Sequence, residues 1–123
     1  MVVEDDPRSQ KLARTLLELR GFDVLTARTA ADAVLLAGEH GPDVILMDIQ
    51  LRGGDGDDGM SALTTLRANS ETARIPVLAI TAFAMKGDEE RFLAHGFSGY
   101  LSKPIDARSF VDVVSSFLPP AEA

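Results

Sequence analysis

The sequence has no cysteine, no tryptophan and only one tyrosine among its 123 residues. Without cysteine, the chain can form neither a disulfide framework nor a thiolate metal site. Long apolar runs are also missing: none exceeds about a dozen residues, whereas a membrane-spanning helix needs about 20. No basic segment followed by an apolar stretch opens the chain, so nothing supports export or membrane attachment. We therefore expect a soluble, cytoplasmic protein.

Basic residues are scarce as well. The chain carries 12 Lys and Arg against 19 Asp and Glu, which gives a formal net charge of -7. Because this charge repels a phosphate backbone, we expect no direct contact with nucleic acid. The length suits a single domain, large enough to bury roughly 65–70% of its unfolded surface. We predict a domain over residues 1–118, followed by a short tail over residues 119–123.

Short apolar segments alternate with helical patterns five times along the chain. The predicted strands cover residues 1–3, 22–27, 44–47, 77–80 and 99–102. This alternation is typical of a parallel sheet with helices on both faces. We therefore predict an α/β fold with a doubly wound, five-stranded parallel sheet of the flavodoxin-like (βα)5 type.

The predicted helices have recognisable ends. Asp6 and Pro7 supply an N-cap and a first helical position, and Gly21 follows the last turn of a helix over about 7–20. Its leucines repeat at helical spacing, at Leu12, Leu16 and Leu19. The second helix is predicted from Thr29 to before Gly41, and the third from about Ser61 to Ala68. The fourth helix is predicted to end at Gly96, and the fifth to run from Asp106 to before Pro119. The apolar positions predicted to face inward on the third and fifth helices are Leu63, Leu66, Phe110, Val113, Val114 and Phe117.

Reactive side chains follow four of the predicted strands at the point where each strand ends. They are Glu4, Asp5 and Asp6, then Asp48, then Thr81, and finally Lys103 before Pro104. In an open parallel sheet the carboxyl ends of the strands share one edge, and ligands bind in the crevice outside it. We therefore expect carboxylates, a hydroxyl and an amine to meet in one pocket, which suits a divalent metal and a phosphoryl group.

The acids could hold Mg²⁺ through carboxylate and water oxygens, in an octahedral shell that leaves positions free for a phosphate. A carboxylate beside the metal can act as a nucleophile toward phosphorus, with Lys103 neutralising charge and Thr81 bonding a phosphoryl oxygen. Each residue alone has a simpler explanation, because acids often stabilise helix N-termini and a lone Lys or Thr is usually a surface group. The position of Asp48 favours the metal site over these simpler explanations, because this carboxylate follows a strictly apolar strand.

Together these motifs resemble the receiver domain of two-component response regulators, over essentially the whole chain. The resemblance lies in Glu4-Asp5-Asp6, Asp48-Ile49-Gln50, Thr81-Ala82 and the run 100–104. The runs 48–51 and 81–90 are most similar to DivK-type single-domain regulators. The resemblance implies the strand order 2-1-3-4-5, in which Glu4, Asp5 and Asp48 meet at the switch point between strands one and three.

The resemblance implies a Mg²⁺-dependent phosphoacceptor that assists its own phosphorylation and dephosphorylation. It has no separate substrate and is therefore not an enzyme in the ordinary sense. Asp48 would accept the phosphoryl group, and Asp5 would bind Mg²⁺ directly. Glu4 would reach the metal mainly through water, while Gln50 would offer its backbone carbonyl and flank the path of hydrolytic water. The implied phosphoryl donor is a phosphohistidine on a histidine kinase or a histidine phosphotransfer protein.

Further roles follow from the same resemblance. Thr81 and Lys103 would contact the phosphoryl group, and Tyr100 would change rotamer on activation. Ala82 would leave the phosphoryl group accessible to its donor, and Phe83 would flank the path of hydrolytic water. A downstream protein would recognise the activated state on the face made by helix four, strand five and helix five.

The chain departs from the family in two places. An insertion of about three residues makes the glycine- and aspartate-rich run 53–59, and we expect a mobile, solvated loop because glycine and like charges oppose ordering. A Ca²⁺ loop that starts at Asp55 is rejected, since Gly59 and Met60 stand where the motif needs an acid and a glycine. The first predicted strand is shorter than usual for the family, with Met1 almost inside it, which leaves a truncated or misassigned start open.

Three other classes of protein are alternatives to a phosphorylated receiver. A hydrolase of the aspartyl-phosphate type needs an acid two residues after its nucleophile, where Gln50 stands. A flavodoxin-like cofactor carrier needs hydroxyls and N–H groups after its first strand, where Glu4 and Asp5 would repel the phosphate. A receiver-like binding module that acts without phosphorylation stays open as the alternative, because the altered loop lies next to the site.

Overall fold

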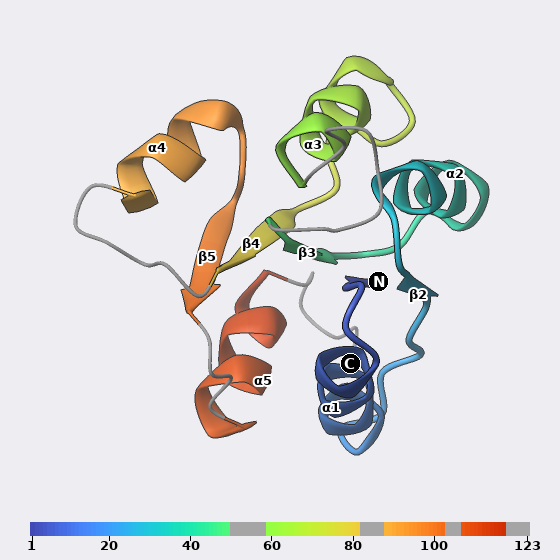
Figure 1. The fold of residues 1–123 in the computed structure, drawn as a ribbon, viewed down its shortest axis with the longest axis vertical. Helices are drawn as coiled ribbons and strands as arrows, with labels where there is room; N and C mark the ends of the chain where they lie inside the picture. Colours follow the sequence, from blue (N-terminus) through green and yellow to red (C-terminus); the bar gives the residue numbers. More distant parts are fainter. Residues whose placement is uncertain (50–58, 82–87, 103–106, 118–123) are drawn as a thin grey trace, which may run out of the picture.

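The computed structural model describes residues 1–49, 59–81, 88–102 and 107–117. Strands and helices alternate along this part of the chain. They are β1 (Val2–Val3), α1 (Pro7–Glu18), β2 (Thr26–Ala27), α2 (Ala30–His40), β3 (Ile45–Asp48), α3 (Gly59–Ala68), β4 (Val77–Thr81), α4 (Asp88–His95), β5 (Gly99–Ser102) and α5 (Ala107–Ser116). Figure 1 shows the sheet as a central layer, with α1 and α5 on one face and α2, α3 and α4 on the other.

The strands form one parallel sheet in the order β2-β1-β3-β4-β5. β1 lies between two neighbours, since Val2 pairs with Thr26 on β2 and with Leu46 on β3. On the other side of β3, Asp48 pairs with Ile80 on β4. The predicted doubly wound α/β fold and its strand order are therefore confirmed.

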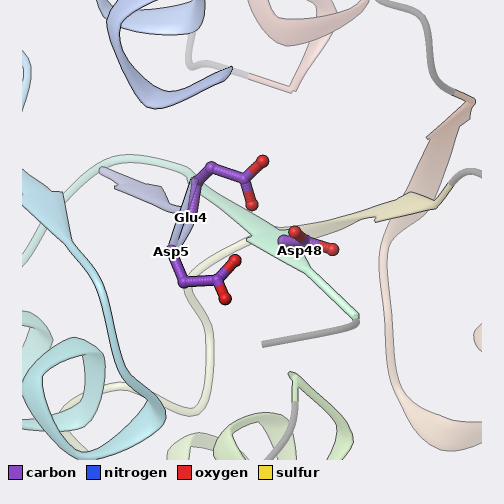
Figure 2. A group of neighbouring side chains, drawn as sticks. All are labelled: Glu4, Asp5 and Asp48. Atoms are coloured by element: carbon purple, nitrogen blue, oxygen red, sulfur yellow. The ribbon is translucent and has the colours of Figure 1, made fainter. Parts of the chain in front are cut away.

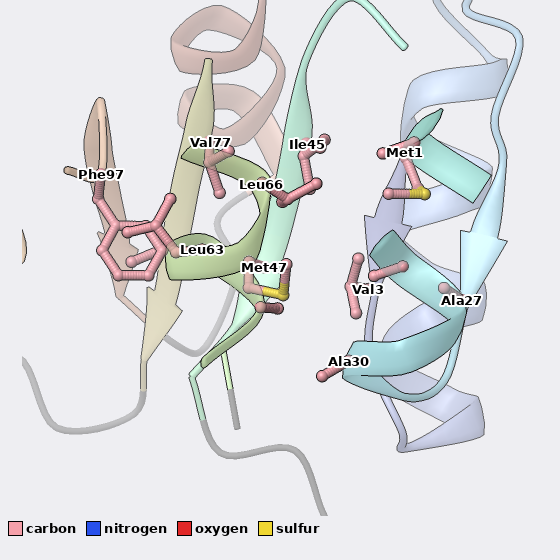
Figure 3. Packing of buried hydrophobic residues seen from close by; sticks show 14 of the residues in the cluster. Met1, Val3, Ala27, Ala30, Ile45, Met47, Leu63, Leu66, Val77 and Phe97 are labelled. Atoms are coloured by element: carbon pink, nitrogen blue, oxygen red, sulfur yellow. The ribbon is translucent and has the colours of Figure 1, made fainter. Parts of the chain in front are cut away.

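Side chains of the sheet alternate between its two faces and form two hydrophobic cores. The core under α2, α3 and α4, seen in Figure 3, takes from the strands Val3, Ile45, Met47, Val77 and Ala79. The core under α1 and α5 takes Val2, Leu46, Leu78 and Ile80. Because both faces are covered, β3 and β4 are apolar at nearly every position. Each large aliphatic side chain that is fully buried here stabilises the fold by roughly 1.5–3 kcal/mol.

Helix α1 begins at Pro7, as the sequence predicts, and its apolar residues are buried to different degrees. Its buried residues are Ala13 and Leu17, whereas Leu12 and Leu19 are 47% and 76% exposed. Of the leucines that repeat at helical spacing, Leu16 is partly buried and packs against the core under α1 and α5. The helix also ends at Glu18, two residues before the end at about residue 20 that Gly21 predicts.

Several element ends differ from the predictions. The strand predicted over 22–27 is only Thr26–Ala27, because β1 offers it only two residues to pair with. The third strand includes Asp48 instead of ending at Met47, and α3 starts at Gly59 instead of Ser61. The inward faces predicted for α3 and α5 agree with the structure at four buried residues, Leu63, Leu66, Phe110 and Val114. The glycines predicted to end α2 and α4 have positive φ angles, at Gly41 and Gly96.

Arg67, near the end of α3, joins three segments through its guanidinium group. Its Nη1 donates to the carbonyl oxygens of Ala73 at 2.9 Å and Ile75 at 2.7 Å. Its Nε and Nη2 donate to the carbonyl oxygen of Gly96 at 3.2 and 3.0 Å. Partial burial lowers the pKa of Arg67 through desolvation. These bonds connect α3, the approach to β4 and the C-terminal end of α4.

The amino end of the sheet contains a buried α-amino group. Met1 is 7% exposed, and its amino nitrogen donates to the carbonyl oxygen of Val44 at 2.7 Å. Desolvation lowers the pKa of this group from 8.0 to about 6, although the charge of Asp43 opposes the shift. A pocket of about 550 Å³ lies beside it, lined by apolar residues such as Phe22 and Val24 and also by the polar residues Asp23, His40 and Asp43. Within the described ranges, no helix is long and apolar enough to cross a membrane.

Candidate metal and phosphoryl site

Three carboxylates meet at the carboxyl edge of the sheet. Glu4 and Asp5 follow β1 directly, and Asp48 is the last residue of the neighbouring β3. One carboxylate oxygen from each residue lies within 4.8 Å of the other two. Figure 2 shows the three side chains arranged around one space at the ends of these strands. The predicted convergence of the acids from strands one and three is therefore observed.

The burial of the cluster favours a cation. Glu4 is 3% exposed and Asp48 is 4% exposed, while Asp5 is partly buried. Charged carboxylates that are this buried need paired charges, hydrogen bonds or a metal ion. Two oxygens bound to one Mg²⁺ at about 2.1 Å can be at most about 4.2 Å apart. Oxygens within 4.8 Å of one another can therefore hold such a cation when the side chains move slightly closer together, or when one of the acids binds it through water.

Asp6 does not belong to the cluster. Its carboxylate accepts hydrogen bonds from Ser9 Oγ at 2.8 Å and from Arg8 N at 3.4 Å, so it caps α1. The Ser9 hydrogen bond is the main reason why the pKa of Asp6 lies below its usual value. With Asp6 bonded to the helix, only the two preceding acids are directed to the site.

Thr81 and Tyr100 lie on the next strands of the same sheet. Thr81 ends β4, is 4% exposed, and pairs with Ser102 on β5. Tyr100 lies two residues before Ser102, where it is partly buried against the core under α2, α3 and α4. Its ring centroid is 6.3 Å from that of Phe92 on α4. The pair predicted to carry the switch therefore occupies neighbouring strands, with Tyr100 in contact with α4.

Four predicted site residues lie outside the described residues: Gln50, Ala82, Phe83 and Lys103. The same is true of Pro104, of the predicted N-cap Asp106, of most of the predicted loop at 53–59 and of the tail at 119–123. Their roles, and the domain boundary at 118, stay predictions.

One residue that lies near the site, Gln10, is not singled out in the sequence. Gln10 donates from its side-chain amide to the carbonyl oxygens of Glu4 at 3.1 Å and Ala27 at 3.2 Å. It stands on α1, six residues after Glu4 and 17 residues before Ala27 in the chain. A polar residue in the first turn of a helix is ordinary in a sequence, so no signal there distinguishes Gln10.

Comparison with known proteins agrees with this geometry. The response regulator receiver domain family matches residues 1–115. The polar-differentiation response regulators DivK of Brucella ovis and Brucella abortus are each 44% identical to the chain over 118 residues, which cover 96% of this chain and 94% of the relative.

Solved structures show the same fold. The receiver domain of NtrX from Brucella abortus superimposes with a TM-score of 0.86 at 22% identity, covering 98% of each chain. The receiver domain of the sensor histidine kinase PA1611 from Pseudomonas aeruginosa, which has a magnesium ion coordinated in its active-site cleft, gives a TM-score of 0.83 at 33% identity, covering 94% of this chain and 93% of that one. With its matching fold, acidic cluster and sequence, the chain belongs to the receiver-domain family of response regulators, signalling domains of two-component systems and not classical enzymes.

Proposed function

We propose that this chain is a Mg²⁺-dependent phosphoacceptor in which Asp48 takes a phosphoryl group from a phosphohistidine. The donor would be a histidine kinase or a histidine phosphotransfer protein, as for receiver domains in general. The observation that carries the proposal is the cluster of Glu4, Asp5 and Asp48, whose oxygens lie within 4.8 Å of one another at the carboxyl edge of the sheet. We assign this activity to a receiver domain over residues 1–118.

In the transfer step, a carboxylate oxygen of Asp48 attacks phosphorus, and the bond from phosphorus to the histidine nitrogen breaks. The imidazole keeps that electron pair and is left as neutral histidine after proton exchange with solvent. Bound by Asp5 and Asp48, by Glu4 through water and by the backbone carbonyl of Gln50, Mg²⁺ would neutralise charge on the transferring oxygens. The Lys103 ammonium would neutralise further charge.

Hydrolysis would return the protein to its starting state. Water adds to phosphorus, the bond from phosphorus to the Asp48 oxygen breaks, and inorganic phosphate leaves the regenerated carboxylate. Gln50 and Phe83 would set how easily this water reaches phosphorus, and Ala82 would leave the site open to the donor. The chain would in this way assist both its phosphorylation and its dephosphorylation.

Output would pass through Thr81 and Tyr100 to the face made by α4, β5 and α5. A hydrogen bond from the Thr81 hydroxyl to the phosphoryl group would draw this side chain toward the site. The vacated volume then favours an inward rotamer of Tyr100, a two-state element that the modification biases. The contact between the Tyr100 and Phe92 rings supports this route, because it links the rotamer of Tyr100 to α4. A downstream protein would bind the altered face.

The test is exposure to acetyl phosphate and Mg²⁺, followed by intact mass. Wild type should gain the mass of one phosphoryl group, and Asp48→Asn should gain none. Asp43→Asn is the matched control, because Asp43 is an exposed acid at the opposite end of β3. If Asp48→Asn is modified at the wild-type rate, the nucleophile is another residue. If wild type is never modified, a receiver-like module that acts without phosphorylation is the better description.

A further inference from the structure

Gln10 hydrogen-bonds the backbone that carries the metal-binding acids. Its side-chain nitrogen donates to the carbonyl oxygens of Glu4 and Ala27, at 3.1 and 3.2 Å. The Ala27 carbonyl oxygen also accepts from the backbone N–H of Glu4, at 3.0 Å. The three residues form a closed ring that joins the first turn of α1 to the ends of β1 and β2.

The chemistry of glutamine suits this ring. Its NH₂ group has two N–H donors, one for each carbonyl oxygen, so both acceptors can be satisfied at once. The peptide between Glu4 and Asp5 is planar, and fixing the direction of the Glu4 carbonyl therefore also fixes the nitrogen and Cα of Asp5. Asp5 is only partly buried, whereas Glu4 and Asp48 are 3% and 4% exposed. Packing constrains Asp5 least of the three acids, so its backbone contacts matter most.

We propose that Gln10 is a positioning residue for the Mg²⁺ site, which holds the Glu4–Asp5 peptide so that the Asp5 carboxylate stays beside those of Glu4 and Asp48. This inference rests on the proposed function. Metal ligands work only when they are held within about 0.5 Å of their productive positions. Removing a group that orients a ligand side chain directly lowers metal affinity roughly 10–100-fold. Gln10 acts through the backbone instead, so we expect a loss of about 3–10-fold.

The test compares Gln10→Met with Lys11→Met. Methionine keeps the length of glutamine but has no N–H donor, and Lys11 is an exposed neighbour on the same helix. Calorimetric titration with MgCl₂, well below the melting temperature of both variants, should show a Kd about 3–10 times higher for Gln10→Met. For Lys11→Met, the Kd should stay near the wild-type value. In metal-free protein, hydrogen exchange at the Glu4 amide should become faster only in Gln10→Met.

A second measurement separates positioning from a general loss of stability. The rate of phosphorylation by acetyl phosphate is followed as a function of Mg²⁺ concentration. Gln10→Met should need more Mg²⁺ for half-saturation but reach the wild-type plateau, because saturating metal restores the occupied site. An unchanged Kd in Gln10→Met, or a lowered plateau with unchanged half-saturation, would overturn the positioning role alone. Absence of Mg²⁺ binding in wild type would overturn the proposed function itself.

Discussion

Replacing Arg67 should destabilise the fold more than its position near a helix end suggests. The guanidinium group makes four hydrogen bonds to the carbonyls of Ala73, Ile75 and Gly96. Buried hydrogen bonds to charged groups contribute about 1.5–3 kcal/mol each, but Arg67 is only partly buried and water can replace part of this loss. We therefore expect Arg67→Met, which keeps the apolar stem, to lower the free energy of unfolding by about 2–3 kcal/mol.

Arg67→Lys should recover only part of this stability. A single ammonium group lacks the planar fork of a guanidinium. It therefore cannot donate hydrogen bonds to the carbonyl oxygens before β4 and at the end of α4 at the same time. Arg74→Met is the matched control, because Arg74 is an exposed arginine in the same connection between α3 and β4. Its effect should stay within about 0.5 kcal/mol, as for ordinary surface substitutions.

Urea unfolding followed by circular dichroism measures these differences. The slope of the free energy of unfolding against urea concentration should be the same for all variants, so that differences between the midpoints report stability alone. Hydrogen exchange adds a local readout: the Phe97 amide, which donates to the Phe92 carbonyl oxygen at 3.1 Å, should exchange faster in Arg67→Met. The reasoning is refuted if Arg67→Met and Arg74→Met have equal midpoints, because the four hydrogen bonds of Arg67 would then contribute nothing measurable.

Three further predictions concern the metal, the switch and pH. Mg²⁺ at 10–30 times its Kd should raise the free energy of unfolding by about 1–2 kcal/mol, and equal melting temperatures with and without metal would count against the site. Beryllofluoride should change the fluorescence of Tyr100, the single tyrosine in a chain without tryptophan, in wild type but not in Thr81→Ala; an equal change in both would exclude the Thr81 route. In a chain that begins at Met1, the α-amino group has a pKa of about 6 when folded and 8.0 when unfolded. The unfolded state then binds more protons between these values, so stability should rise by about 2 kcal/mol from pH 6 to pH 8, a gain that N-terminal acetylation should abolish in thermal melts.

The sheet and its acidic edge could be predicted from the sequence because local pattern and topology determine both. Apolar runs mark buried strands, and the parallel arrangement brings their carboxyl ends to one edge. That is sufficient to place Glu4, Asp48 and Thr81 at the same edge of the sheet, as observed. The roles of Gln50 and Lys103 stay predictions of the same kind, since both residues lie outside the described ranges.

The contacts of Arg67 and Gln10 could not be predicted in this way. Arg67 bonds Gly96, 29 residues away in the chain, and Gln10 bonds Ala27, 17 residues away. Both acceptors are backbone carbonyls, which every residue carries, so neither partner has a side-chain type that a sequence pattern could reveal. The buried side of α1 could not be predicted from leucine spacing either, because tertiary packing against the sheet selects the face that is buried.

The short first strand explains why two adjacent acids can serve one metal. Successive residues of a strand point to opposite faces, so Glu4 continues the side of Val2, and Asp5 continues the side of Val3. Within a sheet these two side chains would lie on opposite faces, with the sheet itself between them. Both residues lie beyond the end of β1, where Figure 2 shows them around the space beside Asp48. A shift of β1 by one residue along its neighbours would exchange its two faces and bury an acid in a hydrophobic core. The pairing of Val2 and Val3 with both β2 and β3 therefore also determines where the acids lie.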